Sequence, residues 1–203
     1  MYEKFVSRFL DKPFIYKLSE AITTPGGNNA IVAEFRKIIK TLPKSEKILD
    51  VGCGPESWLS KLGLNPVGLD ISKKYIESFN KKGGNHGMVG TADEIPCNKD
   101  SFDSVWTIGL FHHLPDNIVK SSIKEMVRVC QNESHIIIFD AVLPRAPWRR
   151  PIAWLIRKAD RGRYMRHENQ LVSLIPENYK IINKYRFTYS YFGHEALIVI
   201  IQK

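Results

Sequence analysis

Two acidic residues that follow short apolar runs stand at a spacing suited to binding a nucleotide. The run Ile48-Leu49 leads to Asp50 and the turn Gly52-Cys53-Gly54, and a second run leads to Asp70, 18 residues after Gly52. Glycines let the backbone approach a ligand closely, and a helix start offers free N–H groups. A carboxylate at this distance along the chain can accept hydrogen bonds from both hydroxyls of a ribose. The two strand ends together predict an adenosine pocket, whereas a helix cap explains either acid alone.

Two neighbouring histidines are candidates for acid–base chemistry. His112 and His113 follow the apolar run Phe102–Ile108, at the sheet edge where ligands bind in open α/β folds. An imidazole can take a proton from a hydroxyl near neutral pH. We name His113 as the candidate base, with a structural role of the pair under a bound ligand as the alternative. Asp140 is a further polar group expected at that edge, with a capping or turn role as its alternative.

Alternating strand-like and helix-like segments predict the elements that would position these residues. The apolar runs of strand length are Lys47–Val51, Pro66–Leu69, Gly87–Val89, Phe102–Ile108, His135–Phe139, Ile181–Phe187 and Ala196–Ile201. Helical periods cover Tyr2–Leu10, Asn28–Leu42, Ser72–Asn80 and Asp116–Cys130. This order predicts an α/β fold with a Rossmann-like, seven-stranded, mostly parallel sheet and helices on both faces. The last two runs are too close for a crossover helix, so we expect an antiparallel C-terminal hairpin.

The composition fits one globular domain. The chain has 203 residues, 43% of them apolar and 25% charged, which suffices for a sizeable core. No apolar run reaches the length of a membrane span and the first residues lack the layout of a signal peptide, which predicts a cytoplasmic protein. Cys53, Cys97 and Cys130 lack CxxC spacing and nearby His at ligand spacing, so neither a disulfide framework nor a metal site is indicated.

Three further motifs extend the pattern along the chain. They are Gly90–Pro96, Asp100–Val105 and Phe111–Asp116. With the glycine turn, and in this order, they resemble the class I S-adenosylmethionine-dependent methyltransferases, in particular the small-molecule branch called methyltransferase type 11. The resemblance runs from about residue 47 to the end of the chain. Ser57 stands where a dinucleotide-binding turn needs its third glycine, which disfavours NAD.

The resemblance implies S-adenosylmethionine as cofactor and S-adenosylhomocysteine as product. It assigns the methionine and ribose part of the cofactor to Asp50, Gly52, Cys53 and Gly54, the ribose hydroxyls to Asp70, the adenine to Ile71 and the Ala92 N–H, and the methionine side to Ile108 and Gly109. The family commonly has Asp where Thr91 stands, so either Thr91 or Asp93 would hold the adenine amino group. Glu56 replaces the family's usual third glycine and puts the shape of the turn in question.

Most of the net positive charge lies in one segment. The formal net charge is +9, and residues 144–166 hold eight basic residues against one acid, a net +7. On a helical wheel, one side gathers Trp148, Ile152, Leu155, Ile156 and Ala159, and the opposite side gathers Arg150, Arg157 and Arg161. This amphipathic basic helix predicts either a lid with its apolar side on the core or a functional surface. Such a surface would take an anionic acceptor, a membrane through residues 147–166, or RNA.

These observations predict a methyltransferase of a small-molecule or lipid- or sugar-linked acceptor, with transfer to oxygen. The alternatives are an RNA-modifying methyltransferase and a non-catalytic module that only binds the cofactor. Nucleic acid is disfavoured because residues 109–112 lack the Asn/Asp-Pro-Pro-aromatic signature of many amino-group methylases and no RNA-binding domain is appended. We divide the single domain, 1–203, into an N-terminal helical cover (1–45), a cofactor-binding half (46–143), a basic acceptor-side insertion (144–176) and the hairpin (177–203). Residues 14–27 are expected to fold over the cofactor, with Tyr16 as a pocket residue.

Overall fold

The computed structural model describes residues 26–82, 86–159 and 163–203. The predictions for residues 2–10, for Tyr16 and for Arg161 lie outside the described residues. Seven strands form one sheet: Ile48–Val51 (β1), Val67–Asp70 (β2), Gly87–Val89 (β3), Phe102–Ile108 (β4), Cys130–Val142 (β5), Lys180–Thr188 (β6) and Glu195–Gln202 (β7). The helices are Gly27–Thr41 (α3), Lys73–Lys81 (α4), Asp116–Val129 (α5), Pro151–Ala159 (α6) and Glu168–Val172 (α7), with 3-10 turns at Ser60–Leu62 (η1), Phe111–His113 (η2) and Pro147–Arg149 (η3).

The sheet has the order β3-β2-β1-β4-β5-β7-β6. Strands β1 to β5 pair in parallel, and β7 runs antiparallel to both β5 and β6. The predicted α/β fold with its antiparallel C-terminal hairpin is therefore confirmed. The carboxyl ends of the parallel strands meet at one edge, which brings the residues after β1, β2 and β4 together.

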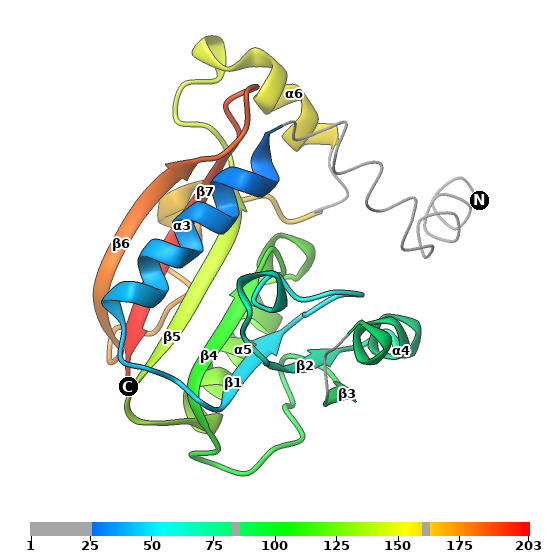
Figure 1. The fold of residues 1–203 in the computed structure, drawn as a ribbon. Coiled ribbons are helices and arrows are strands. Elements are labelled where there is room, and N and C mark those ends of the chain that lie inside the picture. The colour runs from blue at the N-terminus through cyan, green and yellow to red at the C-terminus, as the bar shows by residue number, and fades with distance from the viewer. Residues whose placement is uncertain (1–25, 83–85, 160–162) are drawn as a thin grey trace, which may run out of the picture.

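Two apolar layers cover the two faces of the sheet. In β5, Ile136 and Ile138 pack on the side of α5, and Ile137 and Phe139 pack on the side of α3, because successive side chains of a strand point to opposite faces. These four residues are buried from both sides, which explains why the strand reads as a continuous apolar run. Figure 1 shows α3 along the β6–β7 side of the sheet and α4 beside β2 and β3.

The segment after β5 lies apart from this core. Helix α6 lies next to the turn between β6 and β7 and near the N-terminal end of α3, far from α4 and β3 (Figure 1). Backbone contacts return the chain to the sheet edge after α6, because the Leu143 N–H donates to the Arg166 carbonyl over 2.9 Å. The basic segment therefore borders the edge at which the parallel strands end.

Candidate active site

A cavity of about 200 Å³ opens at the carboxyl edge of β1 and β2. Its lining residues are Gly52, Leu69, Asp70, Ile71, Gly90, Thr91, Ala92, Asp93, Leu110, Leu114 and Ile118. Six of them were singled out from the sequence as cofactor-binding candidates. The cavity walls come from segments far apart in the chain, which the parallel sheet gathers at one edge.

The turn after β1 is shaped by its glycines. Gly52 has φ of 76°, and a Cβ there would lie 2.9 Å from Leu110 Cδ1, so no larger residue fits. The N–H groups of Gly52 and Cys53 donate to the Leu69 carbonyl, over 2.7 and 3.1 Å. Gly54, with φ of 63°, has nothing within 4 Å of its would-be Cβ, which leaves its backbone open to a ligand. The backbone of the turn therefore stays open to a ligand at Gly54 although Glu56 replaces a glycine of the family. Glu56 itself forms an ion pair with Lys82 over 3.6 Å.

Asp70 ties the two strand ends together. Its carboxylate accepts the Gly54 N–H over 3.1 Å and the Ser72 N–H over 2.8 Å. Burial raises the pKa of Asp70, against the lowering effect of these two hydrogen bonds. Each carboxylate oxygen can accept more than one hydrogen bond, so Asp70 can hold the turn and still accept from ribose hydroxyls at the cavity wall.

Asp50 lies below the turn with one oxygen lacking a hydrogen-bond partner. Its Oδ2 accepts the Ser57 hydroxyl over 2.5 Å, whereas Oδ1 is buried and has no partner among the described residues. Burial raises the pKa of Asp50 to about 7; the Ser57 hydrogen bond opposes this and the nearby charge of Asp70 adds to it. Cys53 is also buried, and burial raises the pKa of its thiol, which excludes a reactive thiolate here.

The adenine end of the cavity combines apolar side chains with a loop. Ile71 is 73% exposed at the cavity wall, an arrangement suited to packing on a flat ring. Leu110, Leu114 and Ile118 form the opposite apolar wall and were missed as site residues. Only Ile118 lies in a helix and the chain is extended at Leu114 and Pro115, so no helical spacing in the sequence marks the three as one wall. The predicted residues Thr91, Ala92 and Asp93 supply the polar rim, with Ala92 and Asp93 half-buried.

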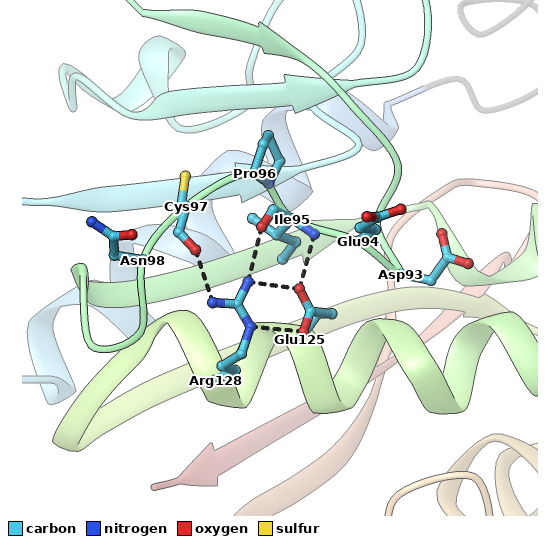
Figure 2. A pocket seen from close by; sticks show the side chains of 8 residues that line it. All are labelled: Asp93, Glu94, Ile95, Pro96, Cys97, Asn98, Glu125 and Arg128. Carbon is cyan, nitrogen blue, oxygen red and sulfur yellow. Dashed lines mark hydrogen bonds and ion pairs between the residues drawn. The ribbon is translucent and has the colours of Figure 1, made fainter.

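A salt bridge on α5 braces the loop that begins with these residues. Figure 2 shows the Arg128 guanidinium between Glu125 and the loop, where it donates to the carbonyls of Ile95 and Cys97, each over 2.8 Å. Glu125 accepts from Arg128 over 2.7 Å and from the Ile95 N–H over 2.9 Å. The pKa of Glu125 is lowered, mainly by its hydrogen bond to Arg128. The pocket of about 510 Å³ that these residues line is braced by the hydrogen bonds among them, and we assign it a structural role in fixing the loop.

The two histidines differ in their surroundings. His112 is buried, and its Nδ1 lies 2.5 Å from Asp140 Oδ1, while its N–H donates to Asp140 Oδ2 over 3.2 Å. His113 is exposed, with its ring centroid 4.0 Å from that of His112. The predicted Gly109 lies directly before this turn and donates to the Phe139 carbonyl over 2.8 Å, and Ile108 is half-buried on the α3 side. The structure therefore pairs His112 with the Asp140 carboxylate through both its ring Nδ1 and its backbone N–H.

Arg166 fixes the histidine turn from the acceptor side. This buried side chain donates to the carbonyls of Phe111 and Leu114, over 2.7 and 2.6 Å, and to Asp116 over 2.6 Å. The Tyr164 N–H donates to the His112 carbonyl over 3.1 Å. One end of the basic segment is thus part of the framework of the site.

The cavity residues fit S-adenosylmethionine on three observations. The apolar walls suit an adenine ring, the Asp70 carboxylate suits ribose hydroxyls, and the buried Asp50 oxygen without a partner suits a positively charged group nearby. Within the parts of the chain that the structure describes, no three His, Cys, Asp or Glu side chains gather to hold a metal ion. Among the same residues, no helix has both the length and the apolar character needed to cross a bilayer.

Known proteins resemble this chain in both sequence and fold. Residues 49–138 match the family model described as a methyltransferase domain. The chain is 31% identical over 137 residues to the tRNA (carboxymethyluridine(34)-5-O)-methyltransferase of Arabidopsis thaliana, covering 64% of this chain and 33% of that protein. It is 32% identical over 108 residues to methyltransferase GfsG of Streptomyces halstedii, covering 48% of this chain and 38% of that protein. The chain therefore spans little more than a third of the length of these two relatives.

A solved structure extends the likeness beyond residues 49–138. The geranyl diphosphate C-methyltransferase of Streptomyces coelicolor A3(2), in complex with Mg²⁺, geranyl diphosphate and S-adenosyl-L-homocysteine, matches with a TM-score of 0.67 at 9% identity. The match covers 84% of this chain and 78% of that chain. At this identity the likeness concerns the fold alone. Residues 49–138 are therefore a methyltransferase domain, and the chain carries the fold of the class I S-adenosylmethionine-dependent methyltransferases.

Proposed function

We propose that the protein transfers a methyl group from S-adenosylmethionine to a hydroxyl oxygen of a small-molecule acceptor. The observation that carries this proposal is the buried contact of 2.5 Å between His112 Nδ1 and Asp140. A hydroxyl must lose its proton as its oxygen attacks the methyl group, so a positioned base accelerates the transfer. The bound cofactor supplies the methyl group and its own leaving group, which leaves positioning and proton removal to the protein.

His112 is suited to the role of that base. Asp140 accepts hydrogen bonds from the Nδ1 and the N–H of His112, which fixes both the ring and its tautomer. With the proton of neutral imidazole on Nδ1, the Nε2 lone pair is left to accept the acceptor's proton. The Asp140 carboxylate then stabilises the imidazolium that forms, as a carboxylate does in other Asp–His pairs.

The cofactor residues take the roles that the cavity supports. We assign the ribose hydroxyls to Asp70 and the adenine to Ile71 with Ala92, and we leave the adenine amino group to Thr91 or Asp93. Asp50 would face the positively charged methionine end through its buried Oδ1. Gly52, Cys53, Gly54, Ile108 and Gly109 would line the path from the ribose to the transferred methyl group.

An amphipathic or lipid-linked acceptor fits the surroundings of the site better than RNA does. Arg145, Arg150 and Arg166 already form ion pairs with Glu168, Glu195 and Asp116, so much of the +7 segment is neutralised by acids outside it. The similarity to the tRNA methyltransferase of Arabidopsis thaliana keeps RNA as the second candidate. The name of that relative also specifies a transfer to oxygen.

Paired histidine variants test the proposal. Formation of S-adenosylhomocysteine is first measured across hydroxyl, amine and RNA acceptors, and then for His112→Asn and His113→Asn on the best acceptor. We expect His112→Asn to lower kcat by about 10²- to 10⁴-fold with an unchanged Kd for the cofactor, and His113→Asn to change kcat less than about threefold.

Four outcomes would count against this assignment. Equal losses in both variants would indicate a structural role of the pair, and a loss in His113→Asn alone would return the role to His113. Turnover of amines or RNA but no hydroxyl compound would refute the oxygen acceptor. Cofactor binding without turnover of any acceptor would favour a non-catalytic binding module.

A further inference from the structure

The apolar side of α6 faces away from the protein. Trp148 in η3 is 77% exposed, and Ile152 and Leu155 in α6 are 53% and 63% exposed. On the other side of the helix, Ala153 and Arg157 are buried. The lid arrangement expected from the helical wheel, with apolar residues on the core and arginines in water, is therefore wrong for these positions. We call Trp148, Ile152 and Leu155 the α6 patch.

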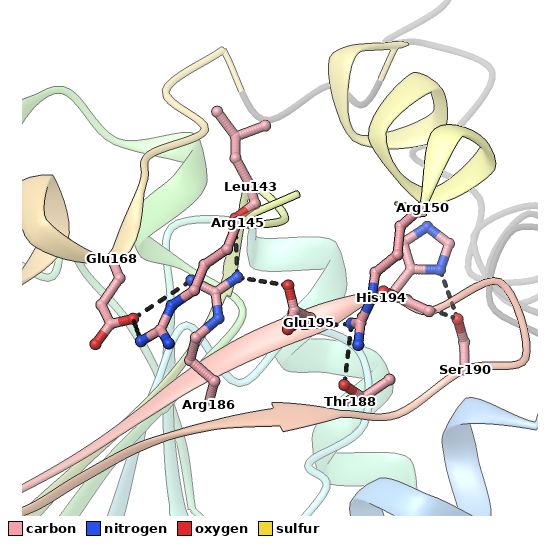
Figure 3. A network of polar contacts seen from close by, with 10 residues as sticks. Leu143, Arg145, Arg150, Glu168, Arg186, Thr188, Ser190, His194 and Glu195 are labelled. Atoms are coloured by element: carbon pink, nitrogen blue, oxygen red, sulfur yellow. Dashed lines mark hydrogen bonds and ion pairs between the residues drawn. The ribbon is translucent and has the colours of Figure 1, made fainter. Parts of the chain in front are cut away.

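Polar contacts explain this orientation. The Arg157 side chain donates to the Tyr189 hydroxyl, and its guanidinium carbon lies 5.7 Å from the centre of that ring. Arg150 donates to Thr188 Oγ1 and the Gly193 carbonyl and forms an ion pair with Glu195 over 3.1 Å, as Figure 3 shows in part. Because these arginines attach α6 to the β6–β7 hairpin by its basic side, its apolar side turns outward.

Two more exposed aromatic residues lie in the hairpin turn next to α6. Tyr191 is 87% exposed and Phe192 is 36% exposed, and the turn that holds them is bonded to Arg150 through Gly193. Half of the large apolar side chains that the described residues expose thus belong to the α6 patch or to this turn. Gathered exposed apolar side chains mark an interaction surface more often than scattered ones do.

The charge around the patch identifies the kind of partner. Helix α6 contains no acidic residue, and Arg149 and Lys158 are exposed beside the patch. A helix with exposed Trp, Ile and Leu flanked by basic residues is typical of segments that lie in the interface of a bilayer. RNA would require the arginines that this structure uses internally, and it offers no apolar interior for Ile152 and Leu155.

We propose that the α6 patch docks on the surface of a lipid bilayer that contains anionic lipids. Trp148, Ile152 and Leu155 enter the boundary between headgroups and acyl chains, and Arg149 and Lys158 bind lipid phosphates. After α6 the chain returns to the histidine turn through the hydrogen bond between Tyr164 and His112. Docking would therefore bring the acceptor side of the site to the membrane, although the docking itself does not depend on the proposed chemistry.

Vesicle sedimentation tests the docking. The full chain is spun with vesicles of phosphatidylcholine alone and with vesicles that contain about 30 mol% phosphatidylglycerol. We expect sedimentation with the anionic vesicles only. The variant Trp148→Ser/Ile152→Ser/Leu155→Ser should weaken it by about tenfold or more, and Arg149→Gln/Lys158→Gln should weaken it by up to about thirtyfold.

The matched control is Ile181→Ser/Ile182→Ser, because these exposed apolar residues lie on the edge strand β6 outside the patch. It should sediment like the unchanged protein, and unchanged thermal unfolding of all variants shows that they fold. The proposal is overturned if the unchanged protein does not sediment, if the patch variant sediments equally well, or if a short RNA binds and releases the protein from vesicles. Turnover of a water-soluble acceptor by the patch variant separates a failure of docking from a failure of the proposed function.

Discussion

We expect Asp50 to lose its proton when the cofactor binds. Its pKa is about 7 in the protein because burial disfavours the carboxylate more than the Ser57 hydrogen bond favours it. A positively charged ligand group nearby would favour the carboxylate and lower this pKa. Binding would then release a proton from Asp50 below about pH 7, which makes the affinity depend on pH.

We therefore expect the Kd of S-adenosylmethionine to decrease as the pH rises from about 5.5 to about 8, by up to about tenfold per pH unit below 7. Titration calorimetry at several pH values measures this slope. Asp50→Asn should flatten it, since the amide does not titrate there and can still accept the Ser57 hydroxyl. The same slope in Asp50→Asn would mean that another group, such as Asp70, is responsible.

A second measurement on the same variant checks the direction in which the pKa of Asp50 is shifted by folding. The folded pKa of Asp50 lies above its ordinary value of 3.8, so the folded state holds the proton more tightly than the unfolded chain. The free energy of unfolding should therefore decrease as the pH rises from about 4 to about 7, and the loss should persist above 7. Asp50→Asn is expected to unfold at a higher denaturant concentration than the unchanged protein at pH 8.

The sequence around the two histidines does not show which of them has a carboxylate partner. His112 and His113 follow the same strand and have the same chemistry, so no local pattern separates them. The difference comes from Asp140, 28 residues later, which β4 and β5 bring beside His112 by pairing in parallel. In contrast, the positions of Asp50, Gly52 and Asp70 at the ends of neighbouring strands could be predicted, because each strand end carries its own signal in nearby residues.

The bounds of the strands and the orientation of helix α6 could be predicted from the sequence to different degrees. The run Phe102–Ile108 was predicted with the bounds that β4 has, because Phe102, Val105, Trp106 and Ile108 give this mostly buried strand its apolar character. Strand β5 was predicted as His135–Phe139 but extends over Cys130–Val142, since its polar beginning contributes pairing without an apolar pattern. The helical period of α6 was also visible. Its orientation depends on Tyr189 and Glu195 in the distant hairpin, which a helical wheel does not include.

The arginines of the basic segment should differ widely in their effect on stability. Arg166→Met leaves the buried carbonyls of Phe111 and Leu114 without their donor, so we expect it to lower the free energy of unfolding by about 2–3 kcal/mol. Arg145→Met breaks only an exposed ion pair with Glu168 and should cost less than about 1 kcal/mol. Urea unfolding of both variants measures the difference. Equal losses in the free energy of unfolding would contradict the role of Arg166 in holding the histidine turn.

For the whole molecule, the location of charge matters more than its sum. A net charge of +9 is typical of proteins that bind nucleic acid, but four arginines of residues 144–166 are bonded to the hairpin, to α7 or to the histidine turn. The basic segment therefore acts largely as an attachment between elements that lie far apart in the sequence. Its exposed part includes the α6 patch, with Arg149 and Lys158 beside it.

The cofactor should stabilise the whole fold because its cavity joins β1, β2, the loop after β3 and the start of α5. Ligand at about 100 times its Kd adds about 2.7 kcal/mol to the free energy of unfolding. For a chain of this size that corresponds to a rise in Tm of about 5–10 °C. We expect this rise with S-adenosylmethionine or S-adenosylhomocysteine, and none with NAD, since Ser57 occupies the position of the third glycine of a dinucleotide-binding turn.

Two aspartate variants make this thermal shift specific to the cavity. Asp70→Ala should raise the Kd by about 10- to 150-fold and remove most of the rise in Tm at the same ligand concentration. Asp103→Ala is the control, because Asp103 also accepts two backbone N–H groups, from Glu46 and Lys47, at the opposite edge of the sheet. It should lower the Tm of the free protein yet keep the full ligand-induced rise. A shift with NAD, or an equal loss of the rise in both variants, would contradict the cofactor or the place assigned to it, because only Asp70 lines the cavity.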